Sequence, residues 1–419
     1  MAGVRAWFSG LFRAKDERLS DTSLPEPHWG IEKLRSFASD HNDFALALYG
    51  QLRQRPGNLF FSPFSIRTAL AMAYAGARSE TAAQMGKAVR FASSDETVHE
   101  AFGELIQRLN AAGGGKYEMA VANSLWGQDG APLRAEFLEL VERHYGGGMS
   151  VVDFRHAVEA ARLRINRWVE DTTRQKIREL IPSGGLVADT RLVLVNAVYF
   201  KGMWALQFPK VATRDAPFYL EGGGKVQAPL MHQHEEVRYL LADGFQAVDL
   251  DYRGGDLSML VFLPDKKDGL RDLETRLFAG MLHDCVAKMR VREVELFLPR
   301  FRMTWGTVDI GAQLRALGMP LAFTPEADFS GMNGHEPPHD NSLFLSAVFH
   351  KAFVEVSEEG TEAAAATASV VLWGRASRPW VLPRVPVFRA DHPFLFAIRD
   401  RKSTAILFLG RVANPTPEN

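Results

Sequence analysis

The sequence predicts an α+β protein, because helix-type and strand-type patterns occupy different parts of the chain instead of alternating regularly. Helical periodicity dominates up to Leu180, and short apolar runs typical of strands follow from Arg191 onward. Of the 419 residues, 46% are hydrophobic and 24% are charged, which suits a folded protein with a large core. No repeat or low-complexity linker lies between Trp29 and Asn414. We therefore expect a single domain over residues 29–415, preceded by an extension of residues 1–28.

The helices are predicted from apolar residues that recur every three or four positions. A long first helix is indicated by Leu34, Phe37, Phe44, Ala45 and Leu48. Residues 65–90 are rich in Ala and Met and are interrupted at Gly76, which predicts two buried helices joined by a turn. Residues 97–109 and 160–180 carry the same periodicity, and glycines at 113–115 end the former helix.

The strands are predicted from short apolar runs. Residues 191–200 are almost continuously Leu, Val, Ala and aromatic, and the run is short enough for a fully buried strand. Similar runs cover residues 257–263, 294–298, 343–353 and 406–412. Residues 217–220 and 246–251 are predicted as shorter strands. Since most of these runs follow the helical part, they favour sheets of mixed connection over repeated βαβ units.

The N-terminal extension carries one apolar helical stripe. Its members are Val4, Trp7, Phe8, Leu11 and Phe12. Arg5, Arg13 and Lys15 accompany the stripe, so residues 4–15 could lie on a membrane surface as a basic amphipathic helix. A tail or a stretch that packs on its own domain is the alternative that we favour. The extension has no apolar run of signal-peptide type and none near the length of a membrane span.

Signatures of enzymes, cofactors and nucleic-acid binding are weak or missing. The net charge of −1 gives no reason to expect a nucleic-acid partner. Glycines 113–115 and Lys116 precede Tyr117, where a phosphate-binding loop needs Ser or Thr, and there is no G-x-S-x-G motif. The pair His232 and His234 alone is a weak metal signal. We expect no catalytic residue, no metal and no cofactor, and a buried structural role for Cys285, the only cysteine.

Residues 358–369, Glu-Glu-Gly-Thr-Glu-Ala-Ala-Ala-Ala-Thr-Ala-Ser, form the most unusual stretch of the chain. Helix propensity alone would make it a helix with Thr361 as its cap. It follows the strand-like residues 353–356, however, and precedes a run rich in Pro and Arg. In an extended chain alternate residues share a face, and the face that begins with Thr361, Ala363 and Ala365 is small and uncharged. Such a face could enter a packed sheet without overfilling it.

These residues resemble the hinge of inhibitory serpins, and five further motifs match that family in order. They are residues 58–66 (NLFFSPFSI), 195–204 (VNAVYFKGMW), 262–265 (FLPD), 328–332 (DFSGM) and 390–394 (ADHPF), and the ending FLGRVANP of residues 408–415 also fits. The chain is therefore similar to disulfide-free prokaryotic or intracellular serpins from about residue 30 to residue 415. The resemblance implies an α+β fold of about three sheets and about nine helices, with an exposed reactive loop at about residues 358–386.

The resemblance also implies a function. A serpin of the inhibitory type is a suicide substrate: a serine protease cleaves the loop, is acylated, and is trapped in a covalent 1:1 complex when the loop inserts into the central sheet. We expect a serine protease partner, a trypsin-like one if Arg375 precedes the cut, and a monomeric inhibitor. The alternative is a non-inhibitory serpin that acts as a binding or chaperone-like protein. Localisation stays open, since the missing signal peptide suits the cytoplasm and the family suits the extracellular space.

Site residues are carried over motif by motif. The hinge comprises Glu358, Glu359, Gly360, Thr361, Glu362, Ala363, Ala364, Ala365, Ala366 and Thr367. Ser62, Ser65, Asn196 and His350 resemble the shutter, a hydrogen-bonded cluster that governs opening of the central sheet. Trp204 and Arg300 resemble the breach, where insertion begins, with Arg300 expected to pair with Glu358.

The scissile bond has two main candidates. Counting along the loop from Gly360, as the family implies, places it at Gly374–Arg375, or at Arg375–Ala376 if the hinge is one residue longer. Cleavage after Leu372 or Arg378 is less expected. The loop also carries additional residues at 377–384, which depart from the family pattern and leave the specificity undecided.

Overall fold

The computed structural model describes residues 30–91, 95–113, 116–130, 132–276, 279–361 and 385–416. The chain folds into two compact units that are interleaved in sequence. The first comprises residues 1–200, 304–353 and 398–409, and the second comprises residues 201–303, 354–397 and 410–419. The single domain expected over residues 29–415 stays a prediction.

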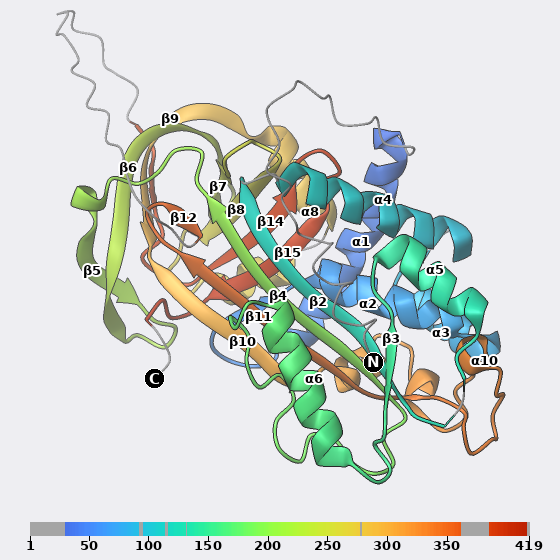
Figure 1. Cartoon of the computed structure of the whole chain (residues 1–419). Helices are drawn as coiled ribbons and strands as arrows, with labels where there is room; N and C mark the ends of the chain where they lie inside the picture. The colour runs from blue at the N-terminus through green and yellow to red at the C-terminus, as the bar shows by residue number, and fades with distance from the viewer. Residues whose placement is uncertain are drawn as a thin grey trace, which may run out of the picture. The chain divides into compact units, whose positions relative to one another are not determined.

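The first unit carries most of the helices (Figure 1). They are α1 (Ile31–Leu52), α2 (Pro63–Gly76), α3 (Ser79–Ala88), α4 (Asp95–Gly113), α5 (Ala135–Tyr145), α6 (Val158–Thr172), α9 (Gly311–Ala316) and α10 (Ser330–Asn333). The second unit holds α7 (Leu270–Arg276) and α8 (Ala279–Lys288). The predicted first helix is confirmed, as is the pair of helices broken after Gly76. None of the described helices is both long and apolar enough to cross a bilayer.

Six strands form one sheet, in which β12 (Gly360–Thr361) pairs with β4. The other five have the order β10 (Phe301–Asp309), β11 (Leu345–Val356), β4 (Leu192–Met203), β2 (Tyr117–Gln128) and β3 (Met149–Val152). In β4, nine consecutive residues from Leu192 to Phe200 are buried, which explains why this run could be predicted as a buried strand.

Nine strands form the other sheet, in which β5 (Arg214–Tyr219) pairs with β6. The remaining order is β1 (Leu59–Phe61), β15 (Ile406–Val412), β14 (Phe394–Asp400), β8 (Leu257–Pro264), β7 (Phe245–Asp251), β6 (Lys225–Ala242), β9 (Arg290–Pro299) and β13 (Val387–Arg389). The α+β class is confirmed, with ten α-helices in the described ranges.

Hydrogen bonding joins the described strands into two sheets, where the resemblance implied about three. The cause lies in β6, which is 18 residues long. Its residues 230–239 pair with β9 and its residues 238–242 pair with β7. One continuous strand therefore belongs to two groups of strands and links them into a single hydrogen-bonded path.

The helix predicted over residues 160–180 ends early, at Thr172 in α6. Arg174 and Gln175 have φ angles of 51° and 62°, a left-handed conformation that a helix cannot continue through. The Thr173 hydroxyl donates to the carbonyl of Val169 at 2.8 Å and accepts from the N–H of Ile177 at 3.2 Å. Ile177 is fully buried all the same, so the periodicity that predicted a longer helix arises from a packed loop.

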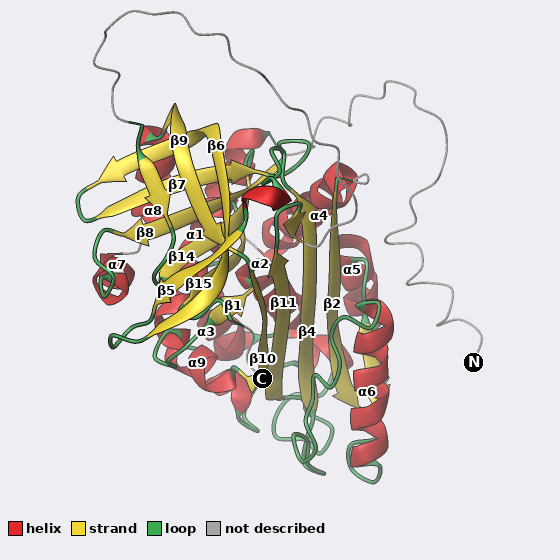
Figure 2. Ribbon diagram, turned by 90° about the vertical axis from the view of Figure 1, so that its left-hand side faces the viewer, coloured by secondary structure: helices red, strands yellow, loops and turns green. Residues whose placement is uncertain are grey.

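A hydrophobic core joins α6 to β2, β4 and β11 in the first unit. From α6 come Ala161, Ile165 and Val169, which pack with Ala120 and Ala122 of β2. Figure 2 shows α6 running beside these strands. Asn166 fixes the loop that follows the helix, because its amide donates to the carbonyl of Ile181 and accepts from the N–H of Ile181, both at 2.9 Å.

Candidate functional site

The predicted hinge begins in a tight turn at the end of β11. The N–H of Ser357 donates to the carbonyl of Gly360 at 2.7 Å, and the N–H of Gly360 donates back at 3.2 Å. The chain then forms β12, in which Gly360 and Thr361 pair antiparallel with Met203 and Gly202 of β4. The first two residues after the turn are therefore already hydrogen-bonded to the six-stranded sheet.

Gly360 is required by both its conformation and its surroundings. Its φ of 137° lies in a region that L-residues rarely adopt. A Cβ at this position would overlap the carbonyl oxygen of Gly202 and lie 2.7 Å from the nitrogen of Trp204. Only a residue without a side chain allows the two backbones to approach this closely.

Glu358 is buried and anchors the turn. Its carboxylate pairs with the half-exposed guanidinium of Arg300 and accepts a hydrogen bond from the Thr213 hydroxyl at 2.7 Å. Burial acts to raise the pKa of Glu358, but the hydrogen bonds from Arg300 and Thr213 prevail and hold it below its ordinary value. The predicted Arg300–Glu358 ion pair is present, and Glu358 is charged at neutral pH.

Glu359 makes a second ion pair, with Lys210, and its side chain is also buried. Its backbone carbonyl accepts from the N–H of Trp204 at 3.0 Å, and the carbonyl of Glu358 accepts from the N–H of Phe208 at 2.9 Å. Two adjacent carboxylates and two adjacent carbonyls thus tie the turn to the segment that follows β4.

Trp204 closes this group. Its indole N–H donates to the carbonyl of Ser357 at 3.0 Å, and its ring stacks on Tyr252 with centroids 4.7 Å apart and planes at 12°. We call Trp204, Arg300, Glu358, Glu359 and Gly360 the hinge cluster. The structure brings together these five sequence-predicted residues, all in the second unit. It adds three partners that the sequence did not indicate, namely Lys210, Thr213 and Tyr252.

The predicted shutter residues also come together, in the first unit. Ser62 caps α2: its hydroxyl accepts from the N–H of Ser65 at 3.1 Å and donates to the carbonyl of Leu407 at 2.8 Å. The amide nitrogen of Asn196 donates to the Ser65 hydroxyl at 2.5 Å. The Asn196 side-chain oxygen pairs with Nδ1 of His350.

The partners of His350 fix its protonation. Nδ1 faces the amide oxygen of Asn196, which can only accept, and Nε2 faces the N–H of Ser62 at 3.3 Å, which can only donate. The ring is therefore neutral with its proton on Nδ1. Burial lowers the pKa of His350 from 6.5 to about 3.

Asn123 completes the shutter cluster, which we define as Ser62, Ser65, Asn123, Asn196 and His350. Its side-chain oxygen accepts from the Ser65 hydroxyl at 2.8 Å and from the amide of Asn196. Sequence reasoning missed it because β2 was not predicted as a strand. An asparagine between buried alanines and leucines, in the run Ala122-Asn123-Ser124-Leu125, was the available signal.

Several predicted positions lie outside the described residues. They are the hinge residues Glu362, Ala363, Ala364, Ala365, Ala366 and Thr367, the scissile-bond candidates Gly374, Arg375 and Ala376, and the N-terminal extension.

The histidine pair considered as a metal signal forms a different arrangement. His232 and His234 of β6 both contact the carboxylate of Glu295 on β9, at 2.6 Å and 2.9 Å. The hydrogen bond to Glu295 raises the pKa of His234, and the histidines in turn lower the pKa of Glu295. Within the described ranges, no three His, Cys, Asp or Glu side chains are grouped so that they could hold a metal ion.

The α+β fold, the glycine turn beside the six-stranded sheet and the buried Ser-Asn-His cluster together define a class of protein. Comparison with known proteins identifies that class. A family model described as Serpin (serine protease inhibitor) matches residues 39–415. The leukocyte elastase inhibitor of Sus scrofa is 40% identical over 392 residues, which cover 91% of this chain and 100% of that protein. Serpin B3 of Homo sapiens is 38% identical over 402 residues, with the same shares covered.

Solved structures agree. Human thyroxine-binding globulin complexed with thyroxine superposes with a TM-score of 0.81 at 31% identity, covering 92% of this chain and 100% of that one. Tengpin, a thermophilic serpin in its native state, gives 0.81 at 25% identity, covering 96% and 98%. The chain belongs to the serpin family.

Proposed function

We propose that the chain inhibits serine-type endopeptidases as a suicide substrate. The observation that carries the proposal is β12. Gly360 and Thr361 pair antiparallel with β4 at the start of the segment expected to insert. Continued in this direction, the loop would add a strand next to β4, and main-chain hydrogen bonds would hold it there. The small uncharged face of Thr361, Ala363, Ala365 and Thr367 suits that insertion.

The covalent step follows from protease chemistry. The protease serine attacks the carbonyl carbon of the scissile residue, Gly374 or Arg375, and an ester forms between them. The peptide C–N bond breaks, and the amine of the next residue, Arg375 or Ala376, leaves with the proton delivered by the protease histidine. The protease then remains attached to the N-terminal part of the loop, and insertion of that part must precede water attack on the ester.

The hinge cluster would control the start of insertion. For the strand to enter, Glu358 and Glu359 must keep or exchange their pairs with Arg300 and Lys210 while the turn at Gly360 moves. Similarity to proteins named leukocyte elastase inhibitor supports protease inhibition, and similarity to thyroxine-binding globulin shows that the same fold accompanies ligand binding in that protein. Whether this chain inhibits a protease or only binds a ligand therefore depends on whether its loop inserts after cleavage.

Incubation with a trypsin-like and an elastase-like protease tests the proposal. We expect an SDS-stable 1:1 complex with at least one of them, together with a released C-terminal peptide whose mass identifies the scissile bond. Thr361→Arg places a long charged side chain on the inserting face, so this variant should be cleaved without forming the complex. Thr275→Arg, at an exposed position, is the matched control and should behave like the wild type. If both proteases cleaved the wild type and neither formed a complex, the result would contradict the proposed inhibition and favour the non-inhibitory alternative.

A further inference from the structure

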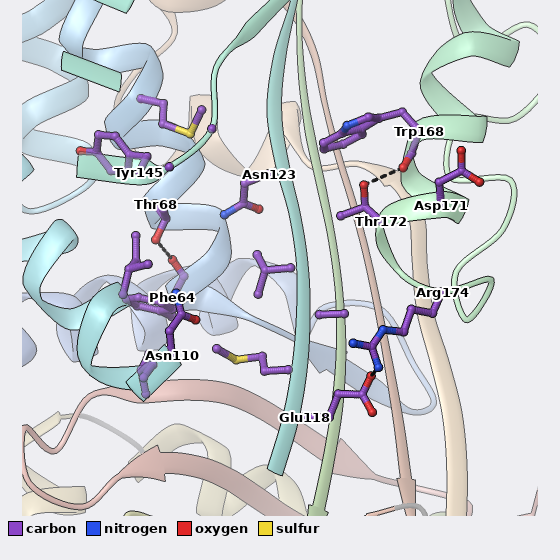
Figure 3. Close-up of a pocket in the computed structure, with 18 of the residues that line it drawn as sticks. Phe64, Thr68, Asn110, Glu118, Asn123, Tyr145, Trp168, Asp171, Thr172 and Arg174 are labelled. Carbon is purple, nitrogen blue, oxygen red and sulfur yellow. Dashed lines mark hydrogen bonds and ion pairs between the residues drawn. The ribbon is translucent and has the colours of Figure 1, made fainter. Parts of the chain in front are cut away.

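A cavity of about 620 Å³ surrounds part of β2 in the first unit (Figure 3). Its volume falls in the range of about 300–1,000 Å³ that is typical of ligand sites. From β2 itself, Glu118, Met119, Ala120, Val121 and Asn123 line it, and the other walls come from α2, α4, α6 and the end of α5. The proposed inhibitory mechanism assigns no ligand to this cavity.

The strand at its centre has an open edge. β3 pairs with β2 only from Leu125 to Gln128. Among the described residues, no strand pairs with residues 118–124 on that side of β2. An edge of this kind presents backbone N–H and C=O groups, and these can pair with another extended chain. At about 3.3 Å per residue, residues 118–123 offer about 20 Å of edge.

One face of β2 looks into an apolar chamber. Met119 and Val121 point to this side together with Asn123, and Phe64, Met72, Ile106 and Leu109 form the wall. Figure 3 shows Phe64, Thr68, Asn110 and Tyr145 on the same side of the strand. The Thr68 hydroxyl already donates to the carbonyl of Phe64 at 2.8 Å, so this chamber suits apolar side chains.

The opposite face looks toward α6, where cationic side chains gather. Arg164, Arg167 and Trp168 line the cavity, as does Arg174, which pairs with Glu118. Arg164 donates to the carbonyl of Val151 at 3.4 Å, and no carboxylate of the described residues forms an ion pair with Arg164 or Arg167. Of the acidic residues of α6, Asp171 is the one that lines the cavity. Both side chains are exposed, and Arg164 also lies over the Trp126 ring at 5.8 Å, so an anionic ligand could pair with either guanidinium without displacing a carboxylate.

We propose that this cavity is a docking site for an extended segment of a partner protein, about six residues long, in which apolar and acidic residues alternate. Successive side chains of an extended peptide point to opposite sides. A peptide paired with the edge of β2 would direct its apolar residues into the chamber beside Met119 and Val121. Its acidic residues would meet Arg164 and Arg167. The apolar chamber and the cationic face lie on opposite sides of one strand edge, which favours an extended peptide over a compact ligand.

Three synthetic octapeptides, each with an N-terminal fluorescent label, test the site by fluorescence anisotropy. The probe alternates leucine and glutamate, the second peptide groups the same residues in two blocks, and the third alternates leucine and lysine. We expect saturable binding of the probe and at least about tenfold weaker binding of the other two, because each loses either the alternation or the charge match. Addition of the probe should also slow amide hydrogen exchange in residues 118–124.

Two charge reversals separate the site from general electrostatic attraction. Arg167→Glu should weaken the probe at least about tenfold and strengthen the leucine–lysine peptide. Arg292→Glu, an equal change at an exposed position on β9, should leave both affinities unchanged. Circular dichroism shows whether each variant is folded, and complex formation with a protease shows whether it still inhibits. Loss of peptide binding is therefore distinguished from loss of the proposed inhibition.

Some outcomes would overturn the proposal. Equal affinity for the alternating and blocked peptides would show that the strand edge does not direct binding, as would unchanged exchange in residues 118–124. Binding of a small amphipathic anion such as dodecanoate, with none of the probe, would identify a lipid-like ligand instead. Concentration-dependent dimers that disappear on adding the probe would mean that a second copy of the chain occupies the edge.

Discussion

His350 is a buried histidine whose two ring nitrogens are both occupied by fixed partners. Its Nε2 accepts from the backbone N–H of Ser62, so a proton can bind there only if this hydrogen bond breaks. Its pKa in the folded state is about 3, against an ordinary value of 6.5. His41 is also fully buried, and burial likewise lowers its pKa to about 3. Both rings must stay neutral for the native packing to hold.

Protonation therefore favours the unfolded state. Between pH 6.5 and about 3 the unfolded chain binds more protons at these two histidines than the folded chain does, so the free energy of unfolding must fall as the pH falls. Each histidine contributes about 1.4 kcal/mol per pH unit well below 6.5. We predict that His350→Gln removes the contribution of one histidine, about 1.4 kcal/mol per pH unit, from the slope of unfolding free energy against pH, whatever its effect on stability at pH 7.

Urea unfolding at a series of pH values from 7 to about 4 measures the slope. His283→Gln, at an exposed position on α8, is the control and should keep the slope of the wild type. Carboxylates that titrate in the same range are common to all three proteins, so the difference between slopes isolates His350. Equal slopes for wild type and His350→Gln would show that the ring is protonated in the folded protein.

At this scale the motifs supplied most of the candidate site. Ser62, Ser65, Asn196 and His350 meet in the structure, as do Trp204, Arg300 and Glu358. The missed partners share a physical reason. Lys210, Thr213 and Asn123 contact residues 58 to 149 positions away, and no local pattern relates them to their partners. Which polar side chains satisfy one another depends on tertiary packing, which spacing along the chain does not encode.

Among the elements, α6 depends on one side chain for its connection to the following loop. The Asn166 amide makes two hydrogen bonds, each 2.9 Å long, with the backbone of the fully buried Ile181. Arg162 adds a hydrogen bond to the same carbonyl, also at 2.9 Å. The N–H of Ile181 has Asn166 as its acceptor, so loss of this side chain would leave a buried donor unpaired.

We predict that Asn166→Ala lowers the free energy of unfolding by about 2–4 kcal/mol, since it removes two buried hydrogen bonds and leaves the backbone N–H of Ile181 without its acceptor. Leu163→Ala lies on the same helix with half of its side chain exposed, and it should change stability by less than about 0.5 kcal/mol. Urea unfolding of the two variants side by side measures the difference. A loss for Asn166→Ala as small as that of the control would mean that water replaces the amide.

Elements with a continuous buried run were predicted best. β15 matches residues 406–412, and the strand predicted over residues 191–200 corresponds to β4. β6 was not predicted as a strand. Its burial pattern mixes exposed and buried residues without strict alternation. α6 was predicted too long, since the buried Ile177 of the following loop continues its periodicity. Periodicity reports burial, and burial alone does not distinguish a helix from a packed loop.

For the whole molecule, the proposed insertion beside β4 predicts that the cleaved chain is more stable than the native one. Within the part of the chain that the structure describes, Gly360 and Thr361 of the expected strand pair with the six-stranded sheet. If cleavage lets the rest enter, the added main-chain hydrogen bonds and buried alanines stabilise the cleaved form. For a chain of this length, a gain of about 5–10 kcal/mol corresponds to a rise of about 6–11 °C in the unfolding midpoint.

We predict that cleavage between Leu372 and Ala376 raises the thermal midpoint, and scanning calorimetry of the purified cleaved protein measures it. The Thr361→Arg variant, cleaved in the same way, should show little or no rise, because its inserting face carries a charge. A midpoint for the cleaved wild type that is unchanged or lower would contradict insertion, even if a protease complex were found.

Cys285 has a practical consequence for following such a change. It is the only cysteine of the chain, it is buried, and burial raises the pKa of its thiol, so the reactive thiolate is scarce at neutral pH. A cysteine introduced at Ala368, on the face opposite to the inserting one, would thus be the one readily labelled thiol without further engineering. A dye attached there would change its surroundings as the strand formed, and stopped-flow fluorescence would time the movement against acylation.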